Sequence, residues 1–254
     1  MSITAKPTSY TVNTGHAKCP DHLWLFNEGT GTTVADEGKG TALDLTLDNS
    51  DMWGTDGSLG SIISANSAGP RKALSSTGTL ASSSLVMVVL HKSASAVCAA
   101  NEFPISAALS SAGGVYGGAR YQTNEALDIV CDDGPNAVAA EFGTSTYDAS
   151  WRMGAVKWKT NAYAVSVDGG AWVAGAGTVN YPPSPTALDR FGIGCRAVTA
   201  ADNQFNGNIL AAWVYDDLYD TVDDTWIADL FSDPWQFLSA AGTTISPNAA
   251  GMSV

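Results

Sequence analysis

The hydrophobic positions of this chain recur mainly with the two-residue period of a β-strand. Leu43, Leu45 and Leu47 alternate with polar residues, which predicts a strand with one buried face. The stretch 84–91 (SLVMVVLH) is almost continuously apolar and predicts a central strand covered on both faces. Further strands are expected at 22–26, 151–158, 191–194 and 209–215.

Two local patterns add a hairpin and a helix. Residues 163–167 lead into Asp168-Gly169-Gly170, which predicts a hairpin whose return strand opens at Trp172. Residues 217–231 have apolar positions at helical spacing with acidic residues opposite, and Pro234 ends that pattern. Many short strands and one late helix predict an all-β fold, a two-sheet antiparallel sandwich with one short helix near the C-terminus.

Composition agrees with one domain and narrows its partners. The 254 residues are 45% hydrophobic and include 26 Gly, which suits one sizeable core with many turns. The formal net charge of -13 disfavours nucleic-acid backbones and anionic membrane surfaces. The longest apolar run, 85–90, is too short to span a bilayer, and residues 1–18 lack the apolar core of a signal peptide. We therefore expect synthesis in a cytoplasm.

Three blocks of sequence resemble laminin-G-like, concanavalin-A-like jelly rolls. "LWLFNEGTGTTVADEGKG" (23–40) is similar to their opening strand and turn, and "WRMGAVKWKTNAYAVSVDGGAW" (151–172) to their central hairpin. "FNGNILAAWVYDDLYDTVDDTWIADL" (205–230) is similar to their closing strand and short helix. The resemblance covers about 20–238 and implies a jelly-roll domain there, between an N-terminal arm (1–19) and a C-terminal tail (239–254).

The segments beside this domain resemble those of tailed-phage and prophage virion proteins. The lead-in "HAKCPDHLWLFNEG" and the ending "DPWQ" carry that resemblance. It implies a non-enzymatic virion structural protein, a decoration (cement) or tail-associated component located in the virion. The alternative is a carbohydrate-binding, lectin-like adhesin displayed on the virion for attachment to a host glycan. Within "DPWQF", Trp235 and Phe237 are expected to fold back over the sandwich as an apolar clasp, with an exposed, sugar-stacking Trp235 as the alternative.

Catalytic motifs of this fold class are missing from the sequence. Glycan-cleaving enzymes commonly carry Glu-x-Asp-x-x-Glu, and the nearest fragment here, Glu125 to Asp128, has the wrong spacing. No Gly-x-Ser-x-Gly nucleophile elbow is present. We therefore predict no enzyme activity.

Metal binding is also not expected. The resemblance places a calcium ligand at Asp36, but its usual partners are replaced near Thr41 and Leu210. Calcium thus stays an open alternative with an incomplete ligand set. The loop 202–207 resembles half an EF-hand loop, and a polar turn is the favoured interpretation. His16, Cys19 and His22 have zinc-like spacing that we attribute to coincidence, and the four cysteines are expected to be buried thiols, with disulfides open in an oxidising medium.

The remaining candidates are aromatic residues and the chain ends. Trp53, Tyr116 and Tyr121 lie in Gly-rich segments and are candidates for stacking on sugar, with packing as the alternative for each. The segments Met1 to Lys18 and Ser239 to Val254 have few large apolar groups and are predicted to dock on other virion subunits through their backbones. Copies joined around an axis, most plausibly as a trimer, would multiply these contacts.

Overall fold

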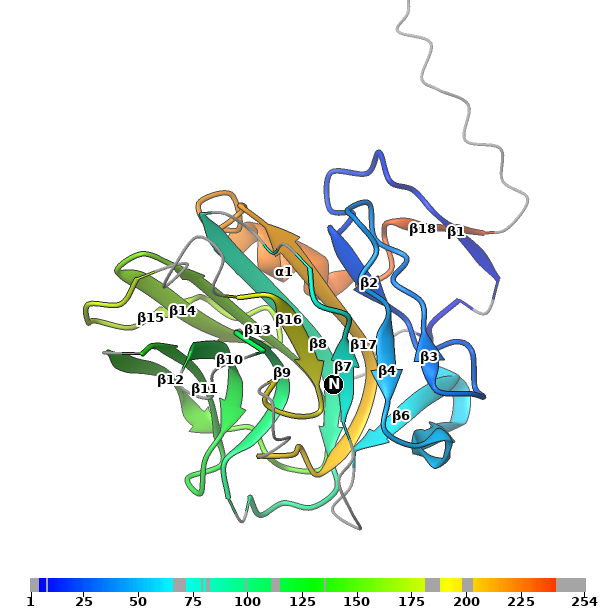
Figure 1. Ribbon diagram of the computed structural model, residues 1–254, viewed down its shortest axis with the longest axis horizontal. Helices are drawn as coiled ribbons and strands as arrows, with labels where there is room; N and C mark the ends of the chain where they lie inside the picture. Colours follow the sequence, from blue (N-terminus) through cyan, green and yellow to red (C-terminus); the bar gives the residue numbers. More distant parts are fainter. Residues whose placement is uncertain are drawn as a thin grey trace, which may run out of the picture.

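The computed structural model describes residues 5–7, 9–65, 72–78, 80, 83–98, 100–110, 115–134, 136–180, 188–197 and 203–240. Within them, two eight-stranded antiparallel sheets pack face to face as a β-sandwich (Figure 1). The expected all-β sandwich is confirmed.

The first sheet has the order β12 (Ala137–Ser145), β11 (Ala126–Asp133), β10 (Val115–Tyr121), β9 (Glu102–Ala108), β16 (Arg190–Ile193), β7 (Ala73–Ser75), β4 (Leu45–Leu47) and β3 (Thr33–Val34). The second has the order β15 (Val173–Ala174), β14 (Ala162–Val167), β13 (Trp151–Lys159), β8 (Ser84–Ser93), β17 (Gly207–Asp216), β6 (Ser61–Ala65) and β5 (Trp53–Thr55). In this sheet β2 (His22–Trp24) also pairs with β17. The elements outside the two sheets are the 3-10 turns η1 (Ser50–Met52) and η2 (Gly57–Leu59), the helix α1 (Asp224–Ser232), and a ribbon of β1 (Tyr10–Val12) and β18 (Leu238–Ala240).

The central strand β8 confirms the prediction made from its continuous apolar run. It lies between β13 and β17, so both of its edges are hydrogen-bonded. Leu85, Met87 and Val89 point into the core between the sheets. The alternate side chains, which point to the opposite face because of the two-residue period, join a second apolar cluster with residues of α1: Val86, Val88 and Leu90.

The helix is shorter than the sequence pattern predicts, because it begins at Asp224 and not at Asp217. Asp217 adopts a left-handed backbone (φ 58°), which ends β17 in a turn. The ammonium of Lys157 donates to the carbonyl of Val222 at 2.7 Å, before the helix starts. Asp223 then caps α1 by accepting from a backbone N–H of its first turn. The 217–223 segment is therefore held as a loop by local side chains.

The predicted hairpin at Asp168-Gly169 is confirmed. Both residues have positive φ (52° and 70°), and they form a tight turn that the N–H of Gly170 closes by donating to the carbonyl of Val167 at 3.0 Å. The return strand begins at Val173, one residue later than expected. The backbone N–H of Trp172 does not join the strand ladder, because it donates to the carboxylate of Asp224 at 2.8 Å.

The predicted clasp at the end of the domain is buried. Pro234 follows the last turn of α1, and the chain then folds over the outer face of β17. Trp235 is only 4% exposed and its ring lies 5.8 Å from that of Trp213. Phe237 is fully buried and meets the same ring at 6.4 Å. Trp235 is therefore a packing residue, and the alternative of an exposed, sugar-stacking Trp235 is wrong.

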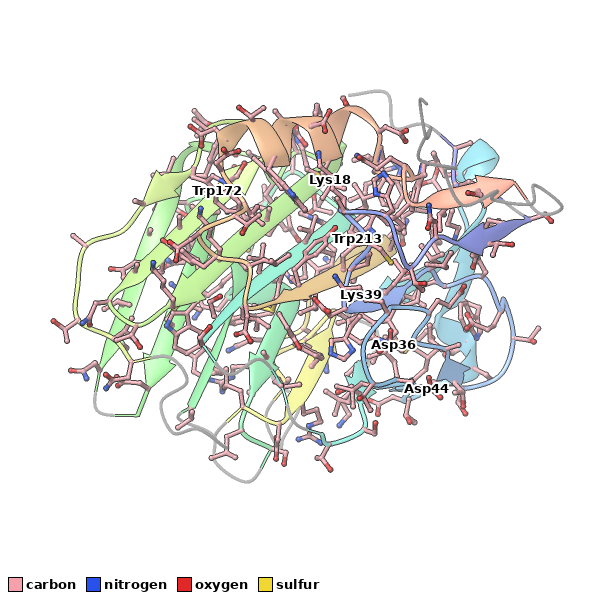
Figure 2. The ribbon with its side chains drawn as sticks, turned by 90° about the horizontal axis from the view of Figure 1, so that it is seen from above. Lys18, Asp36, Lys39, Asp44, Trp172 and Trp213 are labelled. Atoms are coloured by element: carbon pink, nitrogen blue, oxygen red, sulfur yellow. The ribbon has the colours of Figure 1, made fainter. Side chains whose placement is uncertain are left out.

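Parts of the two predicted docking arms pair with each other within the chain, while their docking on other virion subunits stays a prediction. β1 pairs with β18 in antiparallel register, with Thr11 opposite Ser239. Lys18 is also buried, and its ammonium pairs with Asp229 of α1 (Figure 2). These parts of the arms pack against the outer apolar cluster through Tyr10, Val12 and Leu238. Met1 and Val254 lie outside the described residues.

Two further expectations concern the cysteines and membrane insertion. All four cysteines are free and buried. Burial raises the pKa of the Cys98 and Cys195 thiols to about 12, so they stay protonated at neutral pH. Among the described residues, no helix combines the length and apolar character that crossing a bilayer requires.

Candidate functional site

A hollow of about 220 Å³ lies beside Trp53 on the edge strand β5. Among the described residues, its lining consists of Gly29, Trp53, Gly54 and Thr55. Two of these four residues are glycines, so the ring of Trp53 is the largest side chain at the hollow. The site thus offers one aromatic ring surrounded mainly by polar backbone.

Local contacts fix the ring of Trp53. Its indole N–H donates to the carbonyl of Gly31 at 2.8 Å, and part of the ring packs against the main core. Gly29 and Gly31 have φ values of 67° and 80°, a left-handed backbone that glycine adopts without strain. The turn after β2 is therefore brought against β5 by a hydrogen bond. The sequence-predicted candidate Trp53 is half-buried and lies at a hollow.

Tyr116 lies elsewhere, on β10. Its ring is half-buried between the ring of Phe103, 5.9 Å away, and the guanidinium of Arg196, 4.7 Å from the ring centroid. Both partners belong to this chain, so much of the ring is already covered. The structure does not bring Tyr116 together with Trp53.

Tyr121 is not a sugar-stacking residue, because it is only 1% exposed. Its hydroxyl is 2.9 Å from Nε2 of His91, and Thr146 donates to the same hydroxyl at 3.3 Å. Burial lowers the pKa of His91 to about 4, so this ring is neutral at physiological pH. The group is a satisfied polar cluster within the core.

Asp36, the aspartate for which the sequence resemblance implied a calcium ligand, is engaged by hydrogen bonds. Its carboxylate accepts from the backbone N–H groups of Leu23, Gly38 and Leu43 at 2.9, 3.0 and 2.9 Å, and lies 2.7 Å from Nδ1 of His22. Burial alone would raise its pKa, but these hydrogen bonds hold the pKa below its usual value. Asp44 lies alongside and accepts from the backbone N–H of Asp36 (Figure 2). The carboxylate therefore organises the turn between β3 and β4 and ties it to β2.

The three residues with zinc-like spacing are turned to different partners. His16 accepts through Nδ1 from the backbone of Lys18, while His22 pairs with Asp36. Cys19 is buried, and burial raises the pKa of its thiol. In the described ranges, no group of three or more His, Cys, Asp or Glu side chains has a metal-binding arrangement. In the EF-hand-like loop, Asp202 is outside those ranges and Phe205 is fully buried.

A second carboxylate near His22, that of Asp216, is buried in a way that disfavours its charged form. Oδ1 of Asp216 is buried with no hydrogen-bond partner among the described residues. Burial, together with the nearby charges of Asp21 and Asp217, raises the pKa of Asp216 to about 6, although His22 opposes the rise. Compared with the unfolded chain, the folded protein thus holds the proton of Asp216 more tightly. This contribution to stability is complete below the ordinary Asp pKa of about 4 and is lost as the pH rises through about 6.

Asp216→Asn should therefore stabilise the protein at neutral pH by about 1 kcal/mol, because the neutral amide has no charge to bury and needs no proton uptake on folding. Urea unfolding at several pH values would measure this gain, which should disappear towards pH 4. Asp220→Asn is the matched control, since Asp220 is exposed and pairs with Lys159 at the surface. An equal gain at every pH would contradict the assignment.

The fragment nearest to a catalytic carboxylate pair is split by the fold. Asp128 is buried on β11 and is bound by Arg120 and by the side-chain amide of Gln122. Glu125 lies in the preceding turn with a left-handed backbone (φ 64°). Asp128 is thus held in an ion pair with Arg120, and Glu125 lies before β11 and not on it.

Several features of this region were not found from sequence. The hollow is made by β5 and by Gly29, which are far apart in the chain and carry no motif. Elsewhere in the fold, the ammonium of Lys157 lies 4.6 Å from the ring centroids of both Trp172 and Tyr219, and of these residues the sequence pattern indicated only Trp172, as the start of a strand. The alternation of polar and apolar residues contains no signal for either arrangement.

No protein-family model and no curated protein matches this sequence. Solved structures do resemble it. A Trypanosoma rangeli sialidase in complex with 2,3-difluorosialic acid is 13% identical over 87% of this chain and 34% of that chain, with a TM-score of 0.64. The same enzyme in complex with sialic acid is 16% identical over 85% and 33%, with a TM-score of 0.59. The structure called HCR/D-Sa-GBL1/C is 11% identical over 84% and 52%, with a TM-score of 0.61.

The present chain thus spans about a third of the sialidase and about half of the second protein. At these identities the likeness concerns the fold, because unrelated functions share such sandwiches. It is consistent with the concanavalin-A-like β-sandwich expected from the sequence.

Proposed function

We propose that this chain is a glycan-binding domain without catalytic activity, and that the hollow at Trp53 is its binding site. The observation that carries the proposal is the geometry of Trp53. A half-buried aromatic ring, held by its own hydrogen bond, borders a hollow with polar backbone around it. Small-molecule sites typically combine an apolar surface with a few convergent polar groups, and a sugar has both an apolar face and hydroxyls.

The structural likeness supports the same proposal at the level of fold. The sialidase structures that share it contain sialic acid or a derivative of it. The present chain matches only a third of that enzyme, so the enzyme's activity is not carried over. The absence of catalytic carboxylate spacing in the sequence, and the ion pair that occupies Asp128, support a binding role over a hydrolytic one.

Display of this domain on a phage particle is the finer part of the proposal. It rests on the resemblance of the segments 16–29 and 233–236 to virion proteins. A purely structural decoration or tail role, with capsid or tail proteins and copies of itself as partners, is the other reading of that resemblance. Mass spectrometry and cryo-electron microscopy of purified particles would decide whether the chain is present in them and where.

Trp53→Ala is expected to reduce glycan binding by at least about tenfold, because the ring is the largest side chain at the hollow. Binding to a glycan array, followed by titration with the best ligand, would measure the loss. Tyr116→Ala is the matched control, since it removes a half-buried ring from the other sheet. Unchanged binding by Trp53→Ala in a folded protein would move the site elsewhere, and a wild type that binds no glycan would contradict the proposed function.

A further inference from the structure

The strand that carries Trp53 has a free backbone edge. In the described part of the chain, β5 is the last strand of its sheet and pairs only with β6. The backbone N–H of Asp56 donates to the carbonyl of Gly60 at 3.2 Å, which marks these residues as a hydrogen-bonded pair. Because antiparallel pairs alternate, Gly54 and Ile62 form the next such pair.

The residues between those pairs point their backbone groups the other way. The N–H and C=O groups of Trp53 and Thr55 therefore face away from β6. Both residues line the hollow. Backbone groups of Trp53 and Thr55 that do not pair with β6 thus lie at the same place as the aromatic ring, and such groups can pair with neutral hydroxyls.

The charged residues that neighbour the lining residues in the sequence are acidic. Glu28 precedes Gly29 in sequence, Asp56 follows Thr55, and Asp51 lies two residues before Trp53. Two lysines are nearby. Lys92 pairs with Asp56 at 3.3 Å, so its charge is already balanced.

The other lysine, Lys6, belongs to the same neighbourhood but is inaccessible to a ligand. It is 4% exposed, and its ammonium donates to the backbone carbonyls of Leu25 and Phe26. Among the described residues, the hollow therefore has no lysine ready to receive a carboxylate, while the chain as a whole carries a net charge of -13. An acidic sugar would meet repulsion here.

We infer that the Trp53 hollow binds one uncharged sugar ring, stacked on the indole and hydrogen-bonded to the free edge of β5, and that it discriminates against acidic sugars. This inference rests on the proposed glycan-binding function and names its ligand class. The volume of about 220 Å³ suits a single ring, because pockets for larger, drug-sized ligands measure about 300–1,000 Å³. A longer glycan would continue outside the hollow.

The test compares pairs of immobilised glycans that differ only in their terminal unit, a neutral hexose or the same glycan capped with sialic acid or a uronic acid. The wild type should bind the neutral member at least about tenfold more tightly at low salt. The preference should narrow at high salt, since screening weakens the repulsion. Asp56→Asn should also reduce the preference for the neutral glycan, because the loss of one negative charge should tighten binding of the acidic member. Equal or tighter binding of acidic glycans would overturn the inference and leave the proposed function standing, whereas failure of both members would contradict the proposed function itself.

A second variant tests the role of the backbone edge. Thr55→Pro removes an outward-facing N–H at an edge position where proline is tolerated, so the fold should persist. Binding of the neutral glycan should weaken at least about fivefold, in line with a lost hydrogen bond. Thr55→Ala retains the N–H and should bind like the wild type. If Thr55→Pro binds normally, the edge does not contact the sugar. If it instead dissociates a dimer seen by light scattering, the edge pairs with a second copy, and the inference fails.

Discussion

Trp235→Ala is expected to lower the free energy of unfolding by about 3 kcal/mol, as large-to-small changes of buried aromatic residues do. The indole is 4% exposed and packs on Trp213 above the central strands of the second sheet. Its removal opens a cavity between that sheet and the chain after α1. The loss should spread to Phe237, whose backbone carbonyl accepts from the N–H of Asn13 at 2.8 Å and so holds the β1–β18 ribbon.

Urea or thermal unfolding of the domain would measure this effect. Trp235→Phe is the matched control, because it keeps an aromatic ring and should cost less. Trp235→Ala should leave glycan binding unchanged, whereas Trp53→Ala should affect binding more than stability, since Trp53 is only half-buried. A Trp235→Ala protein of normal stability that has lost glycan binding would make Trp235 a ligand contact and contradict the packing role.

The sequence predicted the sandwich well where one strand pattern had one interpretation. The continuous apolar run at 84–91 predicted a strand with both faces covered, and β8 is that strand. The Asp168-Gly169 turn was predictable for a similar reason, because its backbone conformation favours those residues. Local chemistry determined both features.

Predictions failed where a distant contact determined the outcome. Tyr121 follows Gly117 and Gly118, which suggested an exposed, loop-like segment. These glycines lie inside β10, and a Cβ on Gly117 would be 2.5 Å from the ring of Trp158. They are small because another part of the core approaches closely, so the neighbouring tyrosine is buried. The start of α1 was missed for a similar reason, since Lys157, from β13, holds the preceding loop.

The candidate site was predictable only in part. Trp53 could be named because an aromatic residue among glycines stands out in the sequence. Its hollow could not, because Gly29 reaches β5 only through the folded turn after β2. The free edge of β5 depends on the order of strands in the sheet, which the sequence pattern does not contain. Site prediction therefore named one residue and missed its surroundings.

The last prediction concerns the next turn, between β3 and β4. Asp36→Ala is expected to lower the free energy of unfolding by about 3–5 kcal/mol, because three backbone N–H groups and His22 lose their acceptor in a buried place. Gly38 adds to the rigidity of this turn, since a Cβ there would lie 2.2 Å from the carbonyl oxygen of Asp21. The turn has little room to rearrange around the missing carboxylate.

Denaturant unfolding with and without EDTA would test this role directly. Because hydrogen bonds occupy the carboxylate of Asp36, EDTA should leave the melting temperature of the wild type unchanged. Asp44→Ala is the matched control, since Asp44 is exposed and accepts from one backbone N–H, and it should cost about 1 kcal/mol. The pKa of Asp36 is lowered in the folded state, so its contribution is complete above about pH 4 and is lost as the pH falls through the folded pKa. The difference between wild type and Asp36→Ala should shrink in acid. A fall of several degrees in EDTA that calcium reverses would instead make Asp36 a metal ligand.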